Sequence, residues 1–266
     1  MSAPQPLPRP VYSKTSVFVP AITYAPPPGD APWYPPVIAG ADTLSKIHEE
    51  GDFIAASLAL MERLTPDAYT TYLMHYCREG RARFGASWMY ADIVTVLLCL
   101  SRTLKPRTYL EIGVRRGRSA CAVATEAPYS GMFLFDLWQT GYAGIENPGP
   151  DFVRNELVKV NHRGPVSFFD GDSHVTLPRF FAANPSACFD LITVDGDHSE
   201  RGAAQDLCDV LPRLAIGGAI VFDDIAHPAH PELNNVWREL ILGDERFSAW
   251  SFRDAGYGVG FAIRKY

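Results

Sequence analysis

The stretch that decides the fold opens with Asp195-Gly196-Asp197-His198 and closes with Val221-Phe222-Asp223-Asp224. Each acidic segment follows a short apolar run, Phe189 to Val194 in the first case and Ala219 to Phe222 in the second. The residues between them have a helical pattern that ends in Leu214-Ala215-Ile216-Gly217-Gly218. A strand, a helix and a strand in this order predict two parallel neighbours whose carboxyl ends meet at the edge where open α/β sheets bind ligands.

The acidic side chains at this edge predict a cation site. Three or four carboxylates that converge on one point repel one another unless a cation lies between them. Oxygen ligands favour a hard divalent ion, Mg²⁺ first, with Mn²⁺ or Ca²⁺ as alternatives. His198 lies beside the acids in sequence and is the candidate base.

Length and composition are typical of an enzyme domain with an accessory segment. The chain has 266 residues, of which 47% are hydrophobic, enough for one large core. Its net charge of −6 disfavours nucleic-acid binding as the main task. The five cysteines form no CxxC pair, which favours buried thiols over a zinc site or disulfides. The N-terminus has no signal-peptide pattern, and the longest apolar run, Ile93 to Leu100, is too short to span a bilayer. We therefore expect a cytoplasmic protein that does not enter membranes.

Two segments precede the predicted sheet. Residues 1–40 hold half of the 22 prolines, and we expect an extended arm that docks on its own domain or on a neighbouring subunit of a homo-oligomer. A disordered leader is the alternative. Residues 41–105 have helical patterns, with one helix starting at Thr65-Pro66-Asp67 and another spanning about Ser87 to Leu104. This segment is interpreted as a helical cap.

Residues 106–266 alternate between strand and helix patterns, which predicts a Rossmann-like α/β domain. Only Arg253 to Gly256 separate the last two strands, so these form an antiparallel hairpin. The expected fold is a mostly parallel seven-stranded sheet with one reversed strand, preceded by the helical segment and the Pro-rich arm. The expected strands are Tyr109–Ile112, Met132–Phe135, Val166–Phe169, Leu191–Val194, Ala219–Phe222, Ser248–Phe252 and Gly258–Ile263.

Three predicted strands end in side chains that suit a nucleoside with an amino-acid group. The first leads into Glu111-Ile112-Gly113 and Gly117-Arg118-Ser119, where the glycines allow a tight turn and the acid can accept from an ammonium group. The second ends at Asp136, which can hold both hydroxyls of a ribose. The third is followed by Asp172-Ser173, which suits the amine and ring nitrogens of adenine. A helix N-cap is an equally simple interpretation of Asp172 or Ser173.

From about residue 105 onward, these segments resemble the class I S-adenosylmethionine-dependent methyltransferases. The two acidic segments are similar to those of the metal-dependent O-methyltransferases, and catechol O-methyltransferase has metal ligands at positions matching Asp195, Asp223 and Asp224. The macrocin and mycinamicin type of sugar O-methyltransferase is closer. Its histidine base lies three residues after the first acidic ligand, as His198 follows Asp195.

This resemblance implies an S-adenosylmethionine-dependent O-methyltransferase that uses Mg²⁺ or Mn²⁺ and acts on a sugar or natural-product hydroxyl. The acceptor is then a small molecule or a glycoside. The metal ligands would be Asp195, Asp223 and Asp224, and His198 would be the catalytic base. The residues implied in binding the cosubstrate are Glu111, Gly113, Gly117, Ser119, Asp136, Asp172, Ser173 and Asp195.

Two other functions stay open at this level. An NAD-dependent oxidoreductase is one, since Asp136 equally suits the ribose of NAD, although the GxxxG turn and the acidic segments disfavour it. The other is a methyltransferase fold that serves a different role. His227 and His230 are interpreted as surface histidines of a loop, with a ligand or substrate contact as the alternative.

Overall fold

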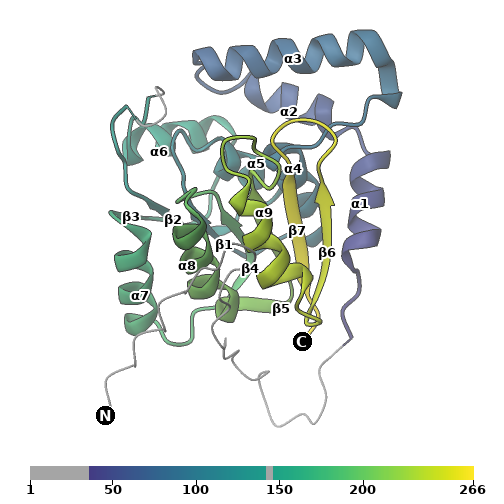
Figure 1. The fold of residues 1–266 in the computed structure, drawn as a ribbon. Helices are drawn as coiled ribbons and strands as arrows, with labels where there is room; N and C mark the ends of the chain where they lie inside the picture. Colours follow the sequence, from purple (N-terminus) through teal and green to yellow (C-terminus); the bar gives the residue numbers. More distant parts are fainter. Residues whose placement is uncertain (1–35, 142–145) are drawn as a thin grey trace, which may run out of the picture.

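A seven-stranded sheet in the order β3-β2-β1-β4-β5-β7-β6 forms the centre of the structure, a computed structural model that describes residues 36–141 and 146–266 (Figure 1). Strand β7 runs antiparallel to both of its neighbours, β5 and β6, and the remaining pairs are parallel. The predicted fold class, a mostly parallel sheet with a terminal antiparallel hairpin, is confirmed. The strands are β1 (Thr108–Ile112), β2 (Gly131–Asp136), β3 (Val166–Asp170), β4 (Phe189–Val194), β5 (Leu214–Asp223), β6 (Phe247–Phe252) and β7 (Val259–Arg264).

Helices cover both faces of the sheet because its central strands are apolar on both sides. On one face, α1 (Ala41–Glu50), α2 (Phe53–Met61), α4 (Ile93–Leu104), α5 (Arg118–Glu126) and α6 (Pro150–Lys159) contribute to a core with Tyr109 and Val221. On the other face, α7 (Ser173–Ala183), α8 (Glu200–Val210), the short turn η3 (Leu211–Arg213), α9 (Glu232–Trp237) and η4 (Arg238–Leu242) pack on Leu110 and Ile220. Figure 1 shows α8 and α9 in front of the sheet.

The helical segment before the sheet lies over the end at which the β6–β7 loop turns. Helix α3 (Ala68–Phe84), followed by the turn η1 (Gly85–Ser87), lies above α2 in Figure 1. Helices α1, α2 and α4 pack into the core on one face of the sheet, with α4 beside α5, so the predicted helical segment is in part a layer of the sheet domain. Nearly all of the predicted Pro-rich arm, residues 1–35, lies outside the described residues.

The segment Leu214–Gly218 belongs to strand β5, and its assignment to the preceding helix is wrong. Leu214 pairs with Phe189 of β4, and the register shifts further along the same pair of strands. Gly217 has a φ of 78°, a conformation that glycine adopts without strain, and this glycine allows the irregular pairing. Apolar residues followed by two glycines suit either a helix end or a bulged strand, and pairing with β4 decides between them.

Two predicted helix starts are also wrong by a few residues. Helix α4 begins after Asp92, whose side chain accepts from the Thr95 amide at 2.8 Å while the Thr95 hydroxyl accepts from the Asp92 amide at 3.0 Å. Helix α3 is capped by Asp67, which accepts from the Thr70 amide at 2.6 Å. Thr65, the predicted cap, instead donates its hydroxyl to Glu156 of α6. Short polar residues compete for the cap, and tertiary partners select among them.

His48 makes the stability of the fold sensitive to acid. Its side chain is buried against Phe53 and Phe252, and Nε2 has no hydrogen-bond partner among the described residues. Burial lowers the pKa of His48 from 6.5 to about 4, against a smaller opposing effect of Asp92. Between these values the unfolded chain binds a proton that the folded protein does not, so stability rises with pH from about 4 to about 6.5 and is lost as pH falls.

We expect His48→Leu to remove this part of the acid sensitivity. The lowered pKa of His48 corresponds to a loss of about 3 kcal/mol in the free energy of unfolding between pH 8 and pH 4. Urea unfolding of both proteins at the two pH values measures it. Since the variant buries no unpaired imidazole, its stability at pH 8 should stay close to that of the wild type. An unchanged difference between pH 4 and pH 8 in the variant would contradict this account.

Candidate active site

A cavity of about 340 Å³ opens at the carboxyl ends of β1, β2, β3 and β4. Parallel strands bring these ends to one edge, so side chains distant in sequence meet there. The predicted site residues that line this cavity are Gly113, Asp136, Asp172, Ser173, Asp195 and His198.

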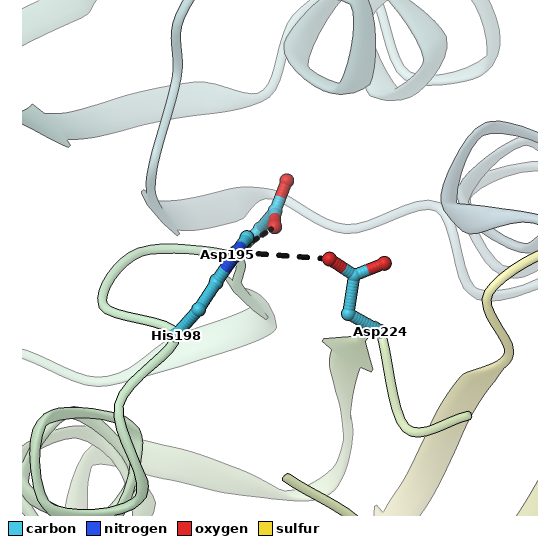
Figure 2. Close-up of side chains that lie close together, drawn as sticks. All are labelled: Asp195, His198 and Asp224. Carbon is cyan, nitrogen blue, oxygen red and sulfur yellow. Dashed lines mark hydrogen bonds and ion pairs between the residues drawn. The ribbon is translucent and has the colours of Figure 1, made fainter. Parts of the chain in front are cut away.

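Asp195, His198 and Asp224 converge at this edge (Figure 2). Asp195 follows β4, His198 lies in the loop before α8, and Asp224 follows β5. The His198 Nε2 atom is 3.3 Å from Asp195 Oδ1 and 3.8 Å from Asp224 Oδ2. One potential ligand atom from each of the three residues lies within 4.8 Å of the other two. Two carboxylate oxygens and an imidazole nitrogen at this spacing fit a divalent metal ion.

The charges of this cluster are poorly compensated by the protein itself. Burial, then the charge of Asp195, raises the pKa of Asp224 to about 7, and the same two causes raise the pKa of Asp223 well above its usual value. Burial lowers the pKa of His198, but the hydrogen bond to Asp195 and the charges of Asp195 and Asp224 outweigh it, and the net shift is upward. The site thus gathers negative charge that a bound cation would offset.

The backbone turns Asp224 into the cluster and leaves Asp223 outside it. Asp224 has a φ of 61°, a left-handed conformation that aspartate tolerates better than most residues. Asp223 is the last residue of β5 and pairs with Val259 of β7. Among the described residues, the group that offers converging ligand atoms includes His198 and does not include Asp223. Of the three predicted metal ligands, the fold therefore gathers Asp195 and Asp224.

Glycines allow the strand ends to approach so closely. Gly113 has a φ of 88°, and a Cβ atom there would lie 1.9 Å from the carbonyl oxygen of Asp195. Gly117 precedes α5 with a φ of 73°, and its Cβ would lie 2.6 Å from a methyl carbon of Val153. Both glycines are required by the turn and its packing.

Glu111 lies beneath this turn and is completely buried. It accepts a hydrogen bond from the Ser119 hydroxyl, while its Oε2 atom has no partner among the described residues. Burial raises the pKa of Glu111 to about 8, partly offset by the hydrogen bond from Ser119. A buried carboxyl oxygen without a donor is the feature expected of a group that binds a ligand cation.

Asp136 holds the glycine-rich turn in place. Its Oδ2 accepts from the amides of Val114 at 2.8 Å and Arg115 at 2.7 Å. Its Oδ1 accepts from the amide of Trp138 at 2.5 Å and the side chain of Asn147 at 3.2 Å. These four donors use the acceptor capacity of a carboxylate, so a ribose hydroxyl would have to replace one of them.

Asp172 and Ser173 were predicted either to contact adenine or to cap a helix, and Asp172 does form a helix N-cap. Asp172 caps α7 by accepting from the His174 amide at 2.9 Å. The Ser173 hydroxyl donates to Asp206 at 2.7 Å. Both residues also line the cavity, so capping and ligand contact are compatible.

The structure brings three further residues, which the predicted site does not contain, close to the acidic cluster. Tyr69 of α3 lies near the acidic cluster, since it lines a small cavity together with Asp195. Burial, and to a smaller extent the charges of Asp223 and Asp224, raise the pKa of Tyr69. The guanidinium carbon of Arg118 lies 4.9 Å from the centre of the Tyr69 ring. His230 lies edge-on to His198, with ring centres 5.2 Å apart. Only the folded chain brings residues so distant in sequence together.

Comparisons with known proteins identify the architecture. Residues 110–225 match a family described as a methyltransferase domain. No curated protein matches the sequence. Within residues 36–141 and 146–266, no helix is long and apolar enough to cross a membrane.

Three solved structures share the fold. The O-methyltransferase TomG from Streptomyces achromogenes, involved in tomaymycin synthesis and solved with S-adenosylmethionine, is 18% identical over 82% of this chain and 91% of its own, with a TM-score of 0.53. An O-methyltransferase from Bacillus cereus in complex with S-adenosylhomocysteine is 19% identical over 79% and 97%, with a TM-score of 0.53. CalS11, a TDP-rhamnose 3′-O-methyltransferase of calicheamicin biosynthesis, is 18% identical over 84% and 91%, with a TM-score of 0.52.

Proposed function

We propose that this chain, which carries a methyltransferase domain with the class I fold, is a divalent-metal-assisted O-methyltransferase that uses S-adenosylmethionine. The observation that carries the proposal is the cluster of Asp195, His198 and Asp224 at the cavity of about 340 Å³. Asp195 and His198 line this cavity and Asp224 lies beside them, an arrangement that suits the deprotonation of a hydroxyl beside a bound methyl donor.

Residues that line the cavity, together with Glu111 buried beneath the turn, would hold and orient the cosubstrate. Glu111 offers a buried carboxyl oxygen to an ammonium group, and Asp172 and Ser173 offer polar atoms at the opposite end. Asp136 fixes the shape of the turn between them and lies at the ribose position. S-adenosylmethionine supplies an electrophilic methyl group on its sulfonium. The chain itself contributes mainly position and the exclusion of water.

Asp195 and Asp224 would hold a metal ion, for which Mg²⁺ or Mn²⁺ is the proposed identity. Such an ion lowers the pKa of a hydroxyl that binds beside it. Asp223 would lie beside the site without holding the ion, since burial and then the charges of Asp195 and Asp224 raise its pKa. His198 Nε2 points into the same space as the carboxylates, so it can accept the proton of an acceptor hydroxyl placed there (Figure 2).

A sugar or natural-product hydroxyl is the proposed acceptor. Two enzymes that share this fold take part in natural-product synthesis: TomG in that of tomaymycin and CalS11, a TDP-rhamnose 3′-O-methyltransferase, in that of calicheamicin. The helical segment places Tyr69 of α3 near the acidic cluster, where it can contact an acceptor. The identity and regiochemistry of the acceptor follow from a product screen with isotopically labelled methyl donor.

Ligand binding tests the proposed cosubstrate directly. We expect S-adenosylhomocysteine to raise the melting temperature in a thermal-shift titration, because a ligand that binds only the folded state stabilises it. NADH should have no effect at the same concentrations. Stabilisation by NADH and not by S-adenosylhomocysteine would favour the oxidoreductase alternative and refute the proposal.

A further inference from the structure

A small cavity of about 60 Å³ adjoins the main one on the side of the helical segment. Both cavities are lined by Gly113, Arg115 and Asp195, so the two cavities lie side by side at the strand ends. Tyr69 and Arg118 line the small cavity and not the main one. Its volume suits a group of a few heavy atoms and is too small for a ring system.

Arg118 is the unusual residue of this cavity. Its guanidinium stacks on the Tyr69 ring at 4.9 Å, yet it makes no hydrogen bond or ion pair within the described residues. Its Nε atom is fully buried without an acceptor. Arg116, two residues earlier, contrasts with it because it pairs with Asp67 at 3.4 Å and Glu146 at 2.8 Å. A buried cationic N–H without an acceptor is costly, and a guanidinium matches a carboxylate with two parallel bonds.

A complementary acidic group lies nearby. Ser119 lines the same cavity and donates its hydroxyl to Glu111, whose other carboxyl oxygen is buried and unpaired. Arg118 precedes Ser119 in the chain and Glu111 accepts the Ser119 hydroxyl, so a cation and a carboxyl group both lie beside Ser119. Together they match an α-amino acid, which carries one charge of each sign. The main cavity then remains for the nucleoside.

We propose that Arg118, held against Tyr69 of the helical segment, binds the carboxylate of the amino-acid end of the methyl donor. This inference rests on the proposed function, since the donor is S-adenosylmethionine. It adds that α3 takes part in cosubstrate binding: Tyr69 fixes the plane of the guanidinium, which makes no hydrogen bond or ion pair in the described part of the chain and whose charge helps to lower the pKa of Asp67. Tyr69 is thus a positioning residue and Arg118 a binding residue.

Calorimetry with two ligands tests the inference. S-adenosylhomocysteine carries the amino-acid group, and 5′-methylthioadenosine has the same nucleoside and sulfur without it. We expect Arg118→Gln to weaken S-adenosylhomocysteine binding about 10- to 100-fold and to leave 5′-methylthioadenosine binding within about twofold of the wild type. The S-adenosylhomocysteine affinity of Arg118→Lys should fall between those of the wild type and Arg118→Gln, because an ammonium group keeps the charge but does not reproduce the paired bonds.

Two further variants separate binding from packing. Tyr69→Leu should weaken S-adenosylhomocysteine binding by a smaller factor than Arg118→Gln, and Tyr69→Phe, which keeps the ring, should restore it. Arg179→Gln removes an exposed arginine of α7 and serves as the matched control, with no change expected for either ligand. Circular dichroism checks that each variant is folded. If Arg118→Gln does not fold, Arg118→Lys takes its place in the test.

Three outcomes would overturn the inference. Unchanged S-adenosylhomocysteine affinity in folded Arg118→Gln would show that the arginine does not bind the donor. A raised KM for the acceptor with unchanged donor affinity would assign Arg118 to an anionic acceptor. Equal loss of both ligands would make Arg118 a packing residue. Failure of the wild type to bind either ligand is a different result, since it refutes the proposed function and the inference with it.

Discussion

His198→Ala should lower kcat by roughly 10²–10⁴, the usual contribution of a general base. The imidazole Nε2 lies 3.3 Å from Asp195 Oδ1 and faces the space in which an acceptor hydroxyl would lie. Donor affinity should stay close to normal, because the nucleoside end of the cavity is lined by other residues. Steady-state kinetics together with calorimetry on S-adenosylhomocysteine measure both effects.

The pH–rate profile distinguishes a base from a packing residue. The wild-type rate should rise with pH as His198 loses its proton, and this limb should vanish in His198→Ala. The charges of Asp195 and Asp224 raise the pKa of His198, so at low metal concentration the limb should lie above that of an ordinary histidine. Added Mg²⁺ offsets those charges and should move it to lower pH. His75→Ala, an exposed histidine of α3, is the control. A near-native kcat in His198→Ala, with the same dependence of the rate on pH, would show that His198 is only a packing residue.

Removal of the metal should abolish activity, and Asp224→Asn should raise the Mg²⁺ or Mn²⁺ concentration required for half-maximal rate roughly 10- to 100-fold. Asparagine is a matched replacement, because it keeps the shape of the side chain and also tolerates the left-handed φ of 61°. Chelation followed by metal titration measures the effect on activity. Binding of Mn²⁺ followed by electron paramagnetic resonance reports it without catalysis.

Asp223→Asn tests which acid of the pair is the ligand. Since Asp224 and not Asp223 lies in the converging group, Asp223→Asn should change the metal requirement less than Asp224→Asn. In the presence of chelator, Asp224→Asn should be at least as stable as the wild type. The substitution removes a carboxylate whose burial and whose repulsion with Asp195 together raise its pKa to about 7. Full turnover after exhaustive chelation would make the carboxylates structural and refute the metal proposal.

The sequence by itself was sufficient for the architecture. Six of the seven strands were predicted to within two residues of their bounds, because short apolar runs bounded by glycine and acids are a local signal, whereas β5 begins five residues before its predicted start. The convergence of Asp195, His198 and Asp224 was also predictable, since parallel strands place their carboxyl ends at one edge. Periodicity failed at Leu214–Gly218 and at the start of α4, where a register shift and a capping box overrode it.

Tertiary structure decided the roles of individual side chains. The adjacent acids Asp223 and Asp224 look equivalent in sequence, but a left-handed backbone at Asp224 turns only that one into the cluster. Asp136 looks like a free ribose ligand, yet the turn it follows folds back and donates to it from Val114 and Arg115. Tyr69 belongs to no motif, and it meets Arg118 of the glycine-rich turn only because α3 packs over the sheet edge. Local patterns fix which elements form and where their ends lie, whereas hydrogen-bond partners and neighbouring charges depend on contacts between residues far apart in the chain.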